Sequence, residues 1–124
     1  MSVRTAVVIT ASNRASRGEY ADLSGASLAK GLTALGYEVS GPHVVSDSID
    51  LISEQLTVAL ANKTRLIVTT GGTGVSPTDV TPEATAPFIE KLIPGFGESL
   101  RAHSRDKVPT SDLTRGLAGT HGTS

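Results

Sequence analysis

Two aspartates and a glycine-rich loop are the residues whose types and spacing could do chemistry in this chain. The loop lies in the stretch TTGGTGVSPTDVTPEAT, residues 69–85, and Asp79 stands near its end. Closely spaced glycines let backbone N–H groups approach an anion, and the hydroxyls of Thr70 and Thr73 add donors. A tight strand-to-helix turn that binds nothing has the same composition, so the loop alone leaves both interpretations open.

The standard nucleotide-binding fingerprints do not fit this loop. A P-loop needs a lysine directly after its last glycine, and no lysine follows Gly74. A dinucleotide-binding fingerprint needs a third glycine at the position that Pro77 occupies. A phosphate held here would therefore be bound by some other arrangement of donors.

Each aspartate has a functional and a structural interpretation. Asp79 could hold Mg²⁺ between nucleotide phosphates, because this ion prefers one or two carboxylates together with substrate oxygens. It could equally be a hydrogen-bond acceptor within the turn before the next helix. Asp47, in the segment VVSDSID, could serve the same metal, but Asp47 or Ser48 could instead cap the helix that follows.

A long polar segment near the start, SNRASRGEYADLSG at residues 12–25, offers further ligand-binding groups. Arg14 and Arg17 could neutralise phosphate and Tyr20 could stack on a ring, although surface arginines are usually only solvated. Loops of this length without secondary structure of their own are more often functional than not. The three histidines, His43, His103 and His121, show no metal-ligand spacing.

Alternating strand-like and helix-like periods must position these loops. Apolar runs predict strands at 4–11, 38–45 and 65–70, and apolar residues at helical spacing predict helices at 24–35 and 48–61. Gly41 and Pro42 indicate a bulge or an edge position in the second strand. Thr81 is predicted to be the N-cap of a further helix with Pro82 at its first position, and Pro87 predicts a kink or break there.

Strands that alternate with helices through short connections predict parallel pairing with right-handed crossovers. We therefore expect an α/β fold, a three-layer α/β/α sandwich with a mostly parallel sheet. Ligands of such sheets bind beyond the carboxyl ends of the strands. The loops 12–23, 46–48 and 71–81 gather there, which would bring Asp47 and Asp79 to one edge, close enough to share a metal.

Composition restricts the class of protein further. The 124 residues suit one domain, and 11 basic against 12 acidic residues leave no broad field to attract nucleic acid or an anionic membrane. The absence of cysteine excludes disulfides, thiolate nucleophiles and cysteine-based zinc sites. The opening MSVRTAVVITAS is too short for a signal-peptide core or a membrane-spanning helix, so a soluble, cytoplasmic protein is expected.

Three segments resemble the MogA/MoaB family of molybdenum-cofactor biosynthesis proteins, which is related to the G domain of gephyrin. They are TTGGTGVSPTDVTPEAT, ASNRASRGEYADLSG and PGFGESLR, and they stand in the order that the family has them. The resemblance runs through essentially the whole chain, and it implies a molybdopterin-binding fold. The coincidence of three segments disfavours an unrelated α/β nucleotide binder that shares only the physics of the turn.

The resemblance also implies an activity. Members of the family bind molybdopterin, and the adenylyltransferase branch joins it to AMP from Mg-ATP with release of pyrophosphate, so Mg²⁺, ATP and molybdopterin are the expected small molecules. The alternative is a molybdopterin-binding or scaffold module without catalysis. The resemblance further implies a homo-trimer or hexamer, with a molybdenum-insertion protein as the partner that would act downstream.

Family roles can be transferred to matching positions of this sequence. The substrate-binding positions implied are Ser12, Arg14, Ser16, Thr70, Gly71, Gly72, Thr73 and Gly74. Asp79, in the DVTPE motif, would hold Mg²⁺ or orient the terminal phosphate of molybdopterin. Asp47 matches the second functional aspartate and would support the same metal, so both aspartates are expected to be catalytic.

The end of the sequence departs from the family pattern. After SDLTRGLAG, which looks helical, family members continue into another strand, a Pro-Gly-Ser-type loop and a closing helix, whereas this sequence ends in THGTS. The expectation is a single molybdopterin-binding domain at 1–124 that lacks those elements. An apolar face of the sheet would then be uncovered, which favours the binding module over the enzyme.

Overall fold

The computed structural model describes residues 3–124, and a parallel sheet forms its core. The sheet has the strand order β2-β1-β3, with β1 at Thr5–Ala11, β2 at Glu38–Val45 and β3 at Leu66–Thr70. β1 is central because its β-branched run tolerates burial on both faces, and Val8 and Ile9 are fully buried. The register of β1 against β2 shifts opposite Gly41 and Pro42, so the predicted edge strand and bulge are both confirmed.

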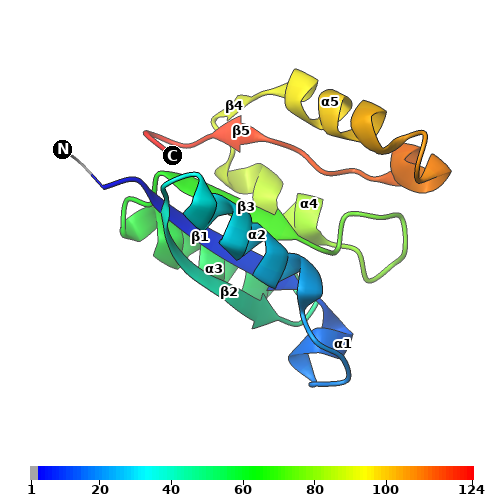
Figure 1. The fold of residues 1–124 in the computed structure, drawn as a ribbon, viewed down its shortest axis with the longest axis horizontal. Helices are drawn as coiled ribbons and strands as arrows, with labels where there is room; N and C mark the ends of the chain where they lie inside the picture. The colour runs from blue at the N-terminus through cyan, green and yellow to red at the C-terminus, as the bar shows by residue number, and fades with distance from the viewer. Residues whose placement is uncertain (1–2) are drawn as a thin grey trace.

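Two helices cover opposite faces of this sheet, as Figure 1 shows: α2 at Leu23–Ala34 and α3 at Ile49–Ala61. The apolar stripe of α3 supplies Ile52 and Leu56 to the hydrophobic core. There they meet Ile9 and Ala11 of β1 and Ala84, which follows β3. The predicted α/β fold with a parallel sheet between helices is therefore confirmed.

The start of α2 and the first polar loop both differ from the sequence prediction. α2 begins at Leu23 rather than at Ser24, because Asp22 is its N-cap and accepts the N–H of Gly25 at 3.0 Å. The first polar loop also contains a short helix, α1 at Asn13–Ser16, where no secondary structure was expected. Ser12 caps that helix by accepting the N–H of Ala15 at 3.2 Å.

The helix after the glycine loop, α4 at Thr81–Thr85, starts differently from the prediction. Thr81 is not its N-cap: Val80 precedes the helix, and Thr81 is its first helical residue. The Thr81 hydroxyl donates to the carbonyl of Gly71 at 2.9 Å instead of capping the helix. The break predicted at Pro87 is confirmed, because α-helix stops at Thr85 and a 3₁₀ turn, η1 at Ala86–Phe88, replaces it.

The last third of the chain forms a separate layer beyond β3. Figure 1 shows α5, at Pro94–Ser104, above the short antiparallel pair of β4, at Lys91–Leu92, and β5, at Gly119–Thr120. The prediction that SDLTRGLAG is helical is wrong beyond its first residues. Only a 3₁₀ turn, η2 at Pro109–Leu113, forms, and the chain then runs without helix into β5. No helix within residues 3–124 is both long and apolar enough to cross a membrane.

Candidate functional site

The carboxyl ends of the three parallel strands bring the predicted loops together. Ala11 at the end of β1 pairs with Val45 of β2, and Thr10 pairs with Thr70 of β3. The loops after β1 and β2 are then joined by a reciprocal pair of hydrogen bonds. The N–H of Asn13 donates to Asp47 Oδ2 at 3.1 Å, and the N–H of Asp47 donates to Asn13 Oδ1 at 2.9 Å.

Asp47 has no capping role in this arrangement. Ser48 is the N-cap of α3, and its hydroxyl accepts the N–H of Leu51 at 3.3 Å. The second oxygen of Asp47, Oδ1, is buried and has no hydrogen-bond partner in the part of the chain that the structure describes. A buried carboxylate oxygen without a donor is costly, so the position is typical of one that receives a ligand cation or donor.

The glycine loop approaches this carboxylate through a backbone that only glycine adopts easily. Gly71 and Gly72 have φ angles of +88° and +67°. A Cβ on Gly71 would collide with the carbonyl oxygen of Ala11, and one on Gly72 would meet the Thr81 hydroxyl and lie 3.1 Å from Asp47 Oδ1. The glycines therefore keep the space in front of Asp47 open.

Asp79 lies beside a different part of the loop. Its Oδ2 accepts the N–H of Ser76 at 3.0 Å, which is the turn-acceptor role that the sequence also allowed. A Cβ on Gly74 would lie 2.7 Å from the same oxygen, whereas Asp47 neighbours Gly72. Residues 3–124 contain no group of three or more side chains arranged to hold a metal ion. That the two aspartates share a metal stays a prediction.

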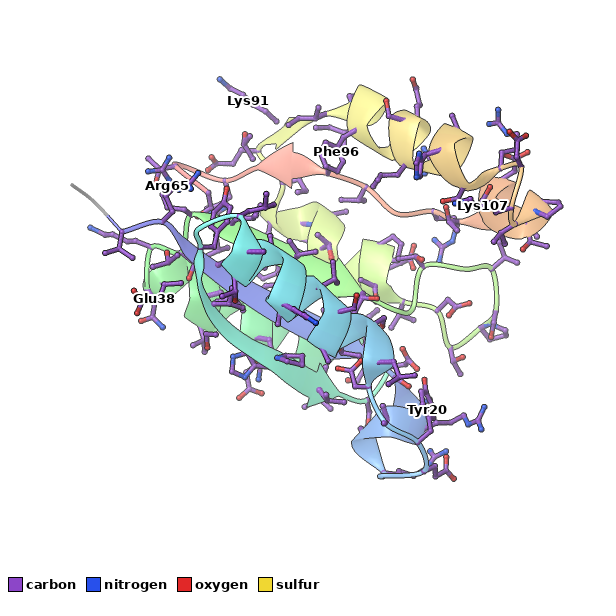
Figure 2. All side chains as sticks on the ribbon, viewed as in Figure 1. Tyr20, Glu38, Arg65, Lys91, Phe96 and Lys107 are labelled. Carbon is purple, nitrogen blue, oxygen red and sulfur yellow. The ribbon has the colours of Figure 1, made fainter. Side chains whose placement is uncertain are left out.

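A pocket of about 410 Å³ opens between these loops, and we call it the polar pocket because carboxylate and hydroxyl side chains line it. Four predicted residues line it: Ser12, Asp47, Gly71 and Gly72. Seven more residues complete the lining: Thr10, Ala11, Tyr20, Ala21, Asp22, Leu23 and Ser24. Figure 2 shows Tyr20 beside α1, at the end of the molecule toward which β1 runs. This pocket is our candidate functional site.

Two predicted residues of the first loop lie outside the pocket lining. The Arg14 guanidinium stands over the Tyr20 ring, with its central carbon 5.1 Å from the ring centroid, a cation–π arrangement. The Tyr20 hydroxyl in turn lies 2.9 Å from the hydroxyl of Ser12. Ser16 contacts Ser46 through their hydroxyls at 3.0 Å, on the exposed side of α1. Arg14 thus contacts Tyr20, which lines the pocket, without lining the pocket itself.

A larger and more apolar groove of about 900 Å³ lies between β3 and the layer of α5 and β5. Its lining includes Phe96, which Figure 2 places between α5 and β5, and several leucines. The predicted residues Thr70, Gly71 and Thr73 also line this apolar groove. Gly71 lines both the groove and the polar pocket. The smaller pocket is the candidate site because its lining carries Asp47, Asp22 and several hydroxyl groups.

Sequence reasoning missed two residues, one that lines the polar pocket and one that holds the glycine loop beside it. Asp22 accepts the Thr10 hydroxyl at 2.7 Å while it caps α2, and an aspartate one residue before the helix was the signal that could have revealed it. Arg115 forms a two-pronged ion pair with Glu83, and this hydrogen bonding holds the pKa of the Glu83 carboxyl below its ordinary value of 4.5. No local signal links Arg115 to the glycine loop, because its bonds to Gly74 and Asp79 span 41 and 36 residues.

Comparison with known proteins shows which family this chain belongs to. Residues 7–120 match the model of a family described as "Probable molybdopterin binding domain". The chain belongs to the MogA/MoaB family. The resemblance drawn from its three sequence segments is therefore confirmed, and the match covers the glycine loop, both aspartates and the polar pocket.

Individual relatives agree with this family. The molybdopterin adenylyltransferase of Helicobacter pylori strain J99 is 42% identical over 116 residues, which are 90% of this chain and 65% of that protein. Molybdenum cofactor biosynthesis protein B of Escherichia coli K12 is 34% identical over 114 residues, 90% of this chain and 66% of that one. The chain thus spans slightly less than two thirds of the length of these curated relatives.

Solved structures share the fold closely. The molybdopterin biosynthesis Mog protein of Mycobacterium ulcerans superposes with a TM-score of 0.90 at 40% identity, over 97% of this chain and 78% of that one. The tungsten cofactor synthesizing protein MoaB of Pyrococcus furiosus gives 0.89 at 32% identity, over 98% and 76%. A MogA/MoaB-type α/β fold is the common architecture.

Proposed function

We propose that this chain acts in molybdenum-cofactor biosynthesis by binding molybdopterin and adenylylating it with Mg-ATP, with release of pyrophosphate. The observation that carries the proposal is that the polar pocket, which holds Asp47, and the apolar groove meet at Gly71. Such a pair suits a reaction that must align two substrates at one point. The names of relatives at 37% to 42% identity support the same activity.

The reaction needs little covalent chemistry from the protein. An oxygen of the terminal phosphate of molybdopterin attacks the α-phosphorus of ATP, a new P–O bond forms, and the bond to the bridging oxygen of pyrophosphate breaks. Positioning two anions and neutralising the charge that moves between them is the catalytic task. Gly71, Gly72, Thr73 and Gly74 would present backbone N–H donors for that purpose, as the family resemblance implies.

A divalent cation fits the donor set of the polar pocket. Asp47 Oδ1 is buried without a partner in the described chain, which suits a carboxylate that holds Mg²⁺ together with phosphate oxygens. Bound Mg²⁺ would neutralise the charge that develops on the leaving pyrophosphate. Asp79 is proposed as the second carboxylate, with Oδ1 available to the cation while Oδ2 accepts the N–H of Ser76.

One observation favours the alternative, a molybdopterin-binding module without catalysis. Asp79 lines neither the polar pocket nor the apolar groove, and its Oδ2 already accepts the N–H of Ser76 within its own turn. In that case the chain would hold the pterin while Mg-ATP found no complete site. The chain covers 65% of the length of the Helicobacter pylori J99 adenylyltransferase, and experiment decides between the two functions.

The biological setting is part of the proposal. A biosynthetic step that consumes ATP suits the cytoplasm, and the family resemblance implies a homo-trimer or hexamer and a downstream molybdenum-insertion protein. Light scattering after gel filtration would measure the assembly. A monomer at micromolar concentration would contradict it.

The deciding experiment for the function combines turnover with binding. Purified chain is incubated with molybdopterin and Mg-ATP, and pyrophosphate is measured with each substrate omitted in turn. Release that requires both substrates supports adenylylation. Isothermal titration then separates the alternative: tight molybdopterin binding without Mg-ATP binding would indicate the module, and no binding of either would refute both functions.

A further inference from the structure

Arg115 is tied to the glycine loop by three hydrogen bonds to backbone carbonyls. Its Nε donates to the carbonyl of Gly74 at 2.7 Å, and its Nη2 donates to the carbonyl of Asp79 at 2.9 Å. Its own backbone N–H donates to the carbonyl of Thr73 at 2.7 Å. The same guanidinium holds Glu83 of α4 through Nη1 at 2.6 Å and Nη2 at 3.1 Å. One residue thus contacts the loop at residues 73–74 and again at Asp79.

These contacts set the direction of the loop's N–H groups. In a planar trans peptide the carbonyl and the following N–H point in opposite directions. Because the carbonyls of Thr73 and Gly74 face Arg115, the N–H groups of Gly74 and Val75 face away from it. Neither N–H has a protein acceptor among residues 3–124. They are therefore free to donate to a ligand.

A loop with glycines at residues 71, 72 and 74 needs such an external constraint, because glycine loses the most conformational freedom when it is ordered. We propose that Arg115 is a positioning residue, which holds the carbonyls of the glycine loop on one side so that its N–H groups are presented to a bound anion on the other. The inference rests on the proposed function for the identity of that anion, a phosphate group of the substrates. The loop geometry itself can be measured without any ligand.

The competing interpretation is that Arg115 only forms a surface ion pair. An exposed pair of this kind contributes little to stability. The two interpretations differ in what happens when Glu83 is removed. A positioning Arg115 keeps its bonds to the loop carbonyls in Glu83→Gln, whereas a simple ion pair is lost in that variant as completely as in Arg115→Ala.

The chain offers a matched control for this test. Arg105 pairs with Asp112 through Nε at 2.9 Å, in the same layer of the fold, and no hydrogen bond or ion pair among residues 3–124 links its side chain to the glycine loop. Arg105→Ala therefore removes an exposed arginine and an ion pair without touching the loop. Arg115→Ala, Arg115→Lys, Glu83→Gln and Arg105→Ala form the set of variants.

The first measurement uses the protein alone. Amide hydrogen exchange and ¹⁵N relaxation of residues 72–75 are recorded by NMR for each variant. We expect faster exchange and greater mobility of these amides in Arg115→Ala, an intermediate change in Arg115→Lys, and none in Arg105→Ala or Glu83→Gln. Lysine restores part of the order because its ammonium can reach one carbonyl but cannot span Gly74 and Asp79 as a guanidinium does.

The second measurement is steady-state kinetics with molybdopterin and Mg-ATP at equal amounts of folded protein. We expect Arg115→Ala to lower kcat/KM about 10- to 100-fold, because small displacements of binding groups have effects of that size. The loss should fall on KM for molybdopterin or ATP as well as on kcat. A purely structural arginine would lower the yield of folded enzyme and leave both constants of the folded fraction unchanged.

The results separate the inference from the proposed function. Loop amides that behave alike in Arg115→Ala and Arg105→Ala would overturn the positioning role, whatever the activity. A wild-type chain that binds neither substrate, with loop amides that still respond to Arg115→Ala, would refute the function and leave the positioning role supported. If Arg115→Ala fails to fold, Arg115→Lys is compared with Arg105→Lys, and the same two readouts decide.

Discussion

Asp47 Oδ1 lies buried against Gly72, in the part of the loop where no side chain intervenes, and finds no hydrogen-bond partner in the described chain. The other oxygen of the carboxylate is fixed by the N–H of Asn13 at 3.1 Å. Asp47 is therefore held in place by one oxygen and left available through the other. The variant Asp47→Asn keeps an oxygen for the hydrogen bond from Asn13 and removes the negative charge, so it should separate anchoring from ligand binding.

Asp47→Asn is expected to fold normally, because the amide oxygen can still accept the N–H of Asn13. Pyrophosphate release should fall by about two orders of magnitude, as for the loss of one group that stabilises charge in a transition state. Activity and thermal denaturation are measured together with Asp50→Asn, an exposed acid in the first turn of α3. Equal activities of the two variants would show that Asp47 has no catalytic role.

Asp79→Asn tests the other carboxylate, whose Oδ2 accepts the N–H of Ser76. A catalytic Asp79 predicts a loss of turnover of about 100-fold with little change in melting temperature. Asp106→Asn, an exposed acid after α5, serves as the control. Full turnover in Asp79→Asn with normal folding would show that Asp79 has only the turn role.

Gly72→Ala should lower the stability of the fold. The φ of +67° is strained for alanine, and its Cβ would crowd the Thr81 hydroxyl, so the free energy of unfolding should fall by about 1–2 kcal/mol or more. Gly31→Ala, inside α2 with open space around it, should instead raise that free energy by about 0.5–1 kcal/mol. Urea denaturation of both variants measures the contrast. A neutral Gly72→Ala would contradict the geometry of the loop.

The Glu83–Arg115 pair should make stability depend on acidity in a defined direction. Hydrogen bonding to Arg115 lowers the pKa of Glu83 below 4.5, so the folded state favours the ionised carboxyl. The pair therefore stabilises the fold fully above the ordinary pKa of 4.5. This contribution is lost as the pH falls from there through the lowered pKa of the folded state. The melting-temperature difference between wild type and Glu83→Gln should be constant near neutral pH and shrink below about pH 4.5. A difference that grew in acid would contradict the assigned pairing.

The sequence by itself determined the parts of this protein that depend on local pattern. Apolar runs placed three strands and helical spacing placed α2 and α3, because burial of a periodic face is decided within one element. Parallel order then predicted that the loops carrying Asp47, Asp79 and the glycines would share one edge of the sheet. The family followed from three short segments, and the match over residues 7–120 confirms it.

Only the tertiary structure decided which of those residues meet and what each one contacts. Capping rules allowed Asp47 or Ser48, and the fold selected Ser48, since Asp47 is held by Asn13 from another loop. Thr81 was a good N-cap by local rules, yet its hydroxyl donates to Gly71. Arg115 reaches the glycine loop across 41 residues, and a contact of that range leaves no trace in the spacing of neighbouring residues. Hydrogen bonds between loops depend on where the sheet brings the chain back, which local sequence does not encode.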